Sequence, residues 1–172
     1  NAGFGSYNMV RLAADFGGML KKSGKISYRL NAGVHNQERA FQFGKAFRYF
    51  ICAAANYAPG KKTSITAEYN YMYGRRSGNN DYLPSIDGKM FVLPRNFAVA
   101  DAATDKLTST DNYYRVQLKH SFNDNWRLIA QGAFANGTYG GYMLNTDSDA
   151  VSNDTLYRAS NFDDFRNFLW TS

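Results

Sequence analysis

The sequence contains little cysteine, little proline and no long apolar run. Cys52 is the only cysteine among 172 residues, which excludes a disulfide scaffold and a metal site built from several cysteines. Three prolines and 15 glycines exclude collagen-like and proline-rich chains. The longest apolar run extends only from Tyr49 to Ala55, whereas a transmembrane helix needs about 20 residues. The chain is therefore not expected to cross a membrane with helices.

The charged residues do not form a block of one sign. The 20 lysines and arginines exceed the 14 acidic residues and give a net charge of +6, but they are spread along the chain and cluster only in pairs. We expect no nucleic-acid partner, because a nucleic-acid surface usually needs a concentrated basic patch. The sequence has no nucleophile elbow and no phosphate-binding loop, and His35 and His120 lie far apart without partners. We expect no catalytic residue, no metal site and no cofactor.

What the sequence has in abundance is an alternation of apolar and polar side chains. Ile26, Tyr28 and Leu30 fall on one side of such a segment, and Arg29 and Asn31 fall on the other. A period of two predicts a β-strand. The same pattern predicts seven strands, over residues 10–16, 25–35, 48–57, 64–73, 113–122, 126–134 and 164–172.

The predicted connections alternate in length. Three are tight turns, at 22–24, 59–61 and 123–125. The other three are long, at 36–47, 74–111 and 137–163. An up-and-down sheet would carry the short turns at one end and the long loops at the other, as outer-membrane barrels do.

Alternation alone fits both a lipid-facing barrel and a soluble β-sandwich or barrel. The polar face is rich in Arg, Asn, Gln and Glu, as in a water-filled lumen, and Tyr57 and Trp126 lie beside short turns, where an interfacial aromatic belt belongs. We therefore predict an all-β fold, an antiparallel up-and-down transmembrane β-barrel. The side chains expected to face lipid are Ile26, Tyr28, Leu30, Ile65, Ala67, Val116 and Leu118, and those expected to face the lumen are Arg29, Asn31, Glu68, Arg115 and Gln117.

From about Gly5 to Phe134 the sequence resembles the barrel of TonB-dependent outer-membrane receptors of the ferric-siderophore type. The motifs that carry this resemblance are Gly5-Ser6-Tyr7-Asn8, Arg11, Asp15-Phe16-Gly17-Gly18, Tyr28-Arg29-Leu30, Arg48-Tyr49-Phe50-Ile51, Tyr57, Thr63, Leu83-Pro84 and Leu93-Pro94-Arg95. The resemblance implies a plugged barrel of about 22 strands, of which residues 1–172 would be a partial barrel domain without the plug. It also implies location in the bacterial cell outer membrane. The implied partners are a ferric siderophore or related chelate, outer-membrane lipid and lipopolysaccharide, and the TonB complex through the absent plug domain.

Aromatic and cationic residues occur together in the predicted long loops. The candidate ligand-binding residues are Arg39, Phe41, Phe43, Arg75, Arg76, Tyr82 and Arg95. Charge-assisted hydrogen bonds and stacking suit an anionic, partly aromatic metal chelate. The alternative is that the aromatic side chains pack the loops and the cations face lipopolysaccharide.

These observations support three hypotheses of function. The leading one is TonB-dependent uptake of a ferric siderophore or a similar scarce nutrient by an outer-membrane receptor that is not an enzyme. The alternatives are a passive outer-membrane porin, with the polar face lining an open channel, and a soluble β-barrel that binds a ligand.

Overall fold

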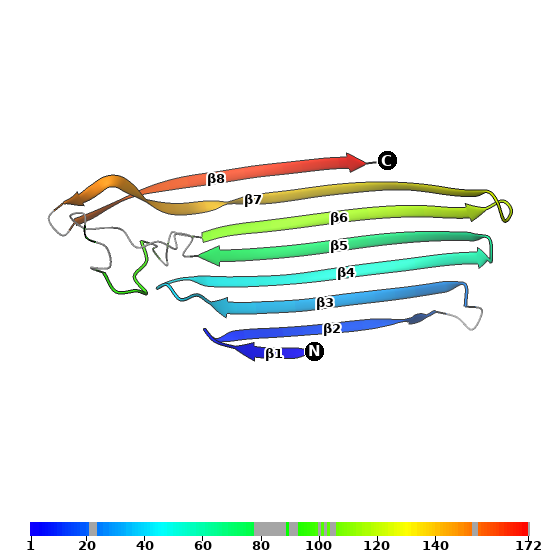
Figure 1. Cartoon of the computed structure of the whole chain (residues 1–172), viewed down its shortest axis with the longest axis horizontal. Helices are drawn as coiled ribbons and strands as arrows, with labels where there is room; N and C mark the ends of the chain where they lie inside the picture. The colour runs from blue at the N-terminus through cyan, green and yellow to red at the C-terminus, as the bar shows by residue number, and fades with distance from the viewer. Residues whose placement is uncertain are drawn as a thin grey trace.

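The protein forms a single antiparallel sheet in which each strand pairs with the next strand in sequence (Figure 1). The computed structural model describes residues 1–20, 24–77, 89, 93–99, 101, 103, 106–152 and 155–171. The strands are β1 (Ala2–Gly5), β2 (Met9–Met19), β3 (Ile26–Glu38), β4 (Lys45–Gly60), β5 (Thr63–Ser77), β6 (Lys106–Ser121), β7 (Arg127–Ser152) and β8 (Thr155–Thr171). No helix in the described part of the chain is long and apolar enough to cross a membrane.

The predicted all-β, antiparallel, up-and-down architecture is confirmed, but the strand count is eight rather than seven. The additional strand, β1, has only four residues, which are too few to show an alternation. The predicted long loop at 137–163 is wrong, because β7 and β8 continue through it as a paired hairpin. That stretch is rich in Gly, Asn, Asp and Thr, which favour turns, but backbone pairing in a strand does not require apolar side chains.

The other two predicted long loops are shorter than expected. The strands β3 and β4 extend into the first one and leave only the turn 39–44. The second narrows to 78–105, because β5 continues to Ser77 and β6 begins at Lys106. The strand ends that these connections join lie at the left of Figure 1, and the strand ends that the short turns join lie at the right. Of the short turns, 22–24 lies mostly outside the described residues, and Pro59 and Gly60 belong to the end of β4.

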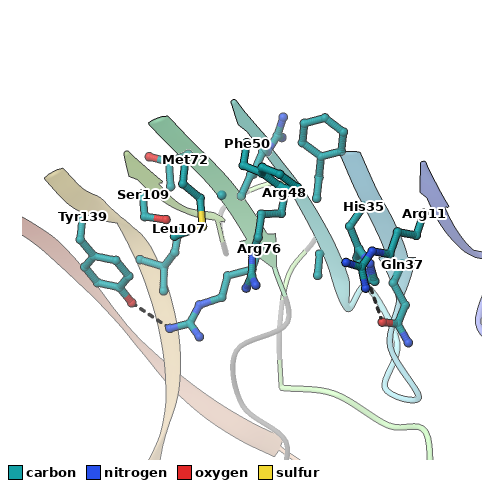
Figure 2. Close-up of a pocket in the computed structure, with 15 residues that line it drawn as sticks. Arg11, His35, Gln37, Arg48, Phe50, Met72, Arg76, Leu107, Ser109 and Tyr139 are labelled. Atoms are coloured by element: carbon teal, nitrogen blue, oxygen red, sulfur yellow. Dashed lines mark hydrogen bonds between the residues drawn. The ribbon is translucent and has the colours of Figure 1, made fainter. Parts of the chain in front are cut away.

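The strand register sorts the side chains onto two faces as predicted. Ala67 pairs with Val116 on one face, and the adjacent Glu68 pairs with Arg115 on the other. Val116 is 53% exposed, whereas the side chains of Glu68 and Arg115 are only 25% and 36% exposed and lie 2.5 Å apart as an ion pair. The strands curve around this polar face, which we call the concave face (Figure 2), and we call the apolar side the outer face.

A second ion pair lies on the concave face. Arg29 donates from Nε to Oδ1 of Asp15 at 3.1 Å and from its second guanidinium nitrogen to Oδ2 at 2.7 Å. This two-pronged geometry matches a guanidinium to a carboxylate. Both charged pairs on the concave face thus join neighbouring strands, β2 to β3 and β5 to β6.

A series of aromatic rings crosses the outer face from β4 to β8. We call it the aromatic series, and its members are Phe47, Tyr49, Tyr73, Tyr71, Tyr69, Tyr114, Phe134 and Trp170. Neighbouring rings lie close together, as at Tyr49–Tyr73 (5.2 Å), Tyr69–Tyr114 (4.9 Å) and Phe134–Trp170 (4.3 Å). The series runs obliquely, because the register row that contains Trp170 meets β4 at Ala53 rather than at Phe47. Strands tilted against a membrane would place such an oblique series at one depth.

Candidate ligand-binding site

A hollow of about 850 Å³ lies on the concave face, at the end of the sheet that carries the long loops. Its size falls within the range of small-molecule sites. Figure 2 labels ten of the residues that line it, which are Arg11, His35, Gln37, Arg48, Phe50, Met72, Arg76, Leu107, Ser109 and Tyr139. They come from β2 to β7, so the hollow is assembled across six strands.

Four arginines line the hollow: Arg11, Arg48 and Arg76 from the concave face, and Arg75, whose register position is on the outer face. Arg11 pairs with His35, and His35 pairs with Arg48, so these three side chains lie next to one another on neighbouring strands. Arg76 lies on β5 two residues beyond Gly74, the partner of Arg48, and it pairs with Leu107 on β6. Among the described residues that line the hollow, none is acidic. The site is therefore positively charged and suits a ligand with anionic oxygen atoms.

Tyr139 holds the side chain of Arg76 in place. The guanidinium of Arg76 donates a hydrogen bond of 2.9 Å to the hydroxyl oxygen of Tyr139. The same guanidinium carbon lies 5.9 Å from the centroid of the tyrosine ring, within the range of a cation–π contact. Figure 2 shows the arginine extended across the hollow toward Tyr139. Only one of the guanidinium's five N–H groups is used in this bond, so the others can bind a ligand.

The part of the hollow nearer the middle of the sheet is apolar. Phe50 and Met72 pair directly across β4 and β5 and both face the hollow. The ring of Phe50 lies over Gly33, because a Cβ on that glycine would be only 2.6 Å from Cε1 of the ring. Glycine at this position therefore lets the ring lie against the sheet. An apolar surface beside the arginines of the concave face can bind an amphipathic anion by contact as well as by charge.

The two adjacent arginines predicted as ligand-binding residues lie on opposite faces. Both belong to β5 rather than to a loop, and consecutive side chains of a strand point to opposite sides. Arg76 points into the hollow, whereas Arg75, which also borders the hollow, pairs with Phe47 and Thr108 on the outer face. Their positions make them a matched pair for testing which face binds the ligand.

The candidates Arg39, Phe41 and Phe43 lie in the turn 39–44 and do not line the hollow. Hydrogen bonds fix this turn to its surroundings. Ser77 Oγ donates to the backbone carbonyl of Phe43 at 2.8 Å, and the backbone N–H of Gln42 donates to the backbone carbonyl of Asn96 at 2.7 Å. Phe43 has a φ of 62°, which is unusual for a bulky residue. The turn is therefore held between β5 and the second loop.

The two remaining candidates belong to the second loop. Arg95 is exposed in the described segment 93–99 and does not line the hollow. Tyr82 lies outside the described residues. Within that segment Val99 and Ala98 are buried, and the Val99 carbonyl accepts a hydrogen bond of 3.0 Å from Arg158 of β8. This part of the loop packs onto the sheet.

The sequence analysis did not identify most of the residues that line the hollow. Arg11, His35, Arg48, Phe50 and Tyr139 all belong to strands, whereas the candidates were sought in loops. A signal was present, because Arg11 and His35 fall on the polar side of their segments. The alignment of His35 with Arg11 and Arg48 depends on the strand register, which alternation does not supply.

These observations describe an antiparallel sheet with an apolar outer face, a polar concave face and a hollow on the concave face at the end of the sheet where the turn 39–44 joins β3 to β4. No family model matches the chain. The chain is 21% identical over 165 residues to the metal-pseudopaline receptor CntO of Pseudomonas aeruginosa, which corresponds to 96% of this chain and 23% of that protein. The predicted resemblance to such receptors is confirmed.

Solved receptor structures have the same fold. The ferripyoverdine receptor of the outer membrane of Pseudomonas aeruginosa superposes with a TM-score of 0.85 at 17% identity, over 94% of this chain and 22% of that one. The siderophore receptor PiuA of Acinetobacter baumannii gives 0.77 at 17% identity, over 97% and 25%. The ferric-catecholate import receptor Fiu of Escherichia coli gives 0.75 at 16% identity, over 97% and 26%. The chain spans about a quarter of the length of these receptors, all of which are named for binding or import.

Proposed function

We propose that this chain is part of the barrel of an outer-membrane receptor that binds an anionic ferric siderophore or related metal chelate in the hollow. The observation that carries the proposal is the lining of the hollow, where Arg11, Arg48 and Arg76 surround the apolar side chains of Phe50 and Met72. The relatives are named as receptors for metal chelates, which favours a receptor over a passive porin.

The complete receptor would span the outer membrane with a closed barrel and contain a plug domain. The eight strands described here would form part of its wall, because lipid requires that every strand edge be paired. TonB would supply the energy for uptake through the plug. These parts of the proposal are implied by the resemblance to TonB-dependent receptors.

The proposal predicts that the two adjacent arginines differ in their effect on chelate binding. In the intact receptor, Arg76→Ala is expected to weaken binding of its ferric chelate by about 1–3 kcal/mol, the usual loss for a hydrogen bond to a charged group. Arg75→Ala is expected to change it by less than about 0.5 kcal/mol, because that side chain lies on the other face. Titration of purified receptor with the chelate measures both values.

An equal loss in the two variants, or no loss in Arg76→Ala, would contradict binding in the hollow. Deletion of residues within 78–92 provides a further arm, because the candidate Tyr82 belongs to that segment. A large loss on deletion, with Arg76→Ala unchanged, would move the recognition site from the hollow to the loop.

The proposal also predicts which face contacts lipid. Leu30 lies on the outer face beside Phe16 and Ala53, and Asn31 lies on the concave face beside Asp15 and Cys52. In the intact receptor in bilayers, a spin label at Leu30 is expected to be reached by a lipid-soluble quencher and a label at Asn31 by a water-soluble one. Electron paramagnetic resonance accessibility at the two positions measures this, and equal values at both would reject the assignment.

A further inference from the structure

The absence of a side chain at position 33 shapes the apolar part of the hollow. Gly33 on β3 pairs with Phe50 on β4. A Cβ on Gly33 would lie 2.6 Å from Cε1 and 2.8 Å from Cζ of the Phe50 ring, so the far edge of the ring fills the space that a side chain would occupy. The next residue in this register row is Ala13 on β2, which is also small. The ring of Phe50 therefore lies toward β3 and not over the hollow.

A side chain at position 33 would move this ring into the hollow. Carbon atoms that are not bonded to each other pack at about 3.5–4.0 Å, so the ring and an added Cβ could not both stay in place. The ring would have to adopt another staggered rotamer. Its other neighbour across the strands is Met72 on β5, which lines the hollow. The displaced ring would therefore cover Met72 and narrow the apolar part of the hollow.

The groups around the ring favour an aromatic ligand. Aromatic rings and thioether groups, as in Phe50 and Met72, both make favourable contacts with further rings. Arg48 lies two residues from Phe50 on the same face of β4, and Arg76 lies four residues from Met72 on the same face of β5. Guanidinium groups stack on aromatic rings and also donate hydrogen bonds to anionic oxygen atoms. A phenolate or catecholate arm offers both features, a planar ring and anionic oxygen atoms.

We infer that Gly33 is a specificity-determining residue of the receptor, which admits the aromatic arm of an anionic chelate by leaving room for the Phe50 ring against β3. The inference rests on the proposed function and narrows the ligand from anionic chelates in general to those with aromatic arms. Gly33 acts through Phe50, because the ring of Phe50 covers it. It is therefore a positioning residue.

The first measurement titrates the intact detergent-solubilised receptor with two iron complexes, a ferric tris-catecholate and ferric citrate, whose arms are aliphatic. Gly33→Ala is expected to weaken binding of the tris-catecholate about tenfold and to change binding of ferric citrate less than about twofold, since small changes in a pocket discriminate ligands on this scale. Gly33→Ala/Phe50→Leu is expected to recover most of the loss, because the leucine side chain is shorter. Phe50→Trp enlarges the ring without the added methyl group and is expected to give the same selective loss.

Gly132→Ala is the matched control for the added methyl group. An added Cβ at Gly132 meets nothing within 4 Å, so both affinities are expected to stay unchanged. The ratio of the two affinities separates a change in the hollow from general destabilisation, which would lower both together.

The second measurement needs no chelate. The variant Met72→Cys, in a receptor that also carries Cys52→Ala, is labelled with fluorescein maleimide, and the rate is followed. Adding Gly33→Ala is expected to slow labelling about tenfold by moving the ring over position 72, as expected for a side chain shielded from a reagent. Adding Phe50→Leu is expected to restore the rate. Gln117→Cys, on the concave face but outside the hollow, is expected to be labelled at the same rate with and without Gly33→Ala.

The outcomes separate the inference from the proposed function. Equal tris-catecholate affinity of Gly33→Ala and the wild type, an equal loss for both complexes, or binding of ferric citrate alone by the wild type would overturn the inference. Labelling of Met72→Cys that does not depend on Gly33→Ala would overturn it as well. If neither complex binds the wild type while the labelling still depends on position 33, the proposed function is rejected and the positioning of Phe50 by Gly33 stands.

Discussion

Val116→Arg is expected to destabilise the membrane-inserted receptor by about 2–4 kcal/mol, whereas Gln117→Arg is expected to have little effect on its stability. Val116 lies on the outer face between Ala67 and Gly132, in the apolar band, and an arginine near the bilayer midplane costs about that much. Gln117 lies on the concave face, where its amide nitrogen donates to Gln131 at 3.1 Å.

Urea-dependent folding of the two variants into phospholipid vesicles measures the difference. The two substitutions add the same side chain at neighbouring positions, so general effects of charge on expression or solubility cancel. Equal stability of Val116→Arg and Gln117→Arg would show that the outer face does not contact lipid. It would favour instead the soluble β-barrel considered at the sequence level.

Alanine at Gly141 is expected to destabilise the fold by about 1–3 kcal/mol, the usual cost of a residue held in an unfavourable backbone conformation. Gly141 has a φ of +138°, and an added Cβ would collide with the carbonyl oxygen of Lys106 on β6. Glycine therefore allows β7 to pass close to β6 where the hairpin of β7 and β8 leaves the rest of the sheet.

Gly132 on the same strand is the control for this substitution. An added Cβ there meets nothing within 4 Å, so Gly132→Ala is expected to change stability by less than about 0.5 kcal/mol. Thermal unfolding of the detergent-solubilised receptor compares the two variants. A midpoint for Gly141→Ala equal to that of Gly132→Ala would mean that β7 can pass β6 without glycine at position 141.

The strands and their faces could be predicted from the sequence because both depend on a local pattern. A lipid-facing side chain must be apolar and its neighbour in the strand need not be, so Ala67 and Glu68 reveal their faces directly. The strand ends could not be found in this way. Beyond the apolar band the selection for apolar side chains ends, and β7 continues through Gly140, Asn145 and Thr146 without any alternation.

The hollow could not be predicted because it depends on contacts between strands. Arg11, His35 and Arg48 are separated in sequence and become neighbours only through the register of β2, β3 and β4. Arg75 and Arg76 show a second error, in which two residues predicted to act together lie on different faces. Placing the end of β5 too early made two arginines on opposite faces look like one cationic cluster.

The ion pairs of the concave face have a consequence for how an anionic ligand would travel. Asp15 neutralises Arg29, and Glu68 neutralises Arg115, so the wall below the hollow attracts an anion weakly. The arginines around the hollow therefore attract an anion more strongly than the neutralised pairs do. For the proposed ligand, entry would be downhill, and onward passage would require work done by another part of the receptor.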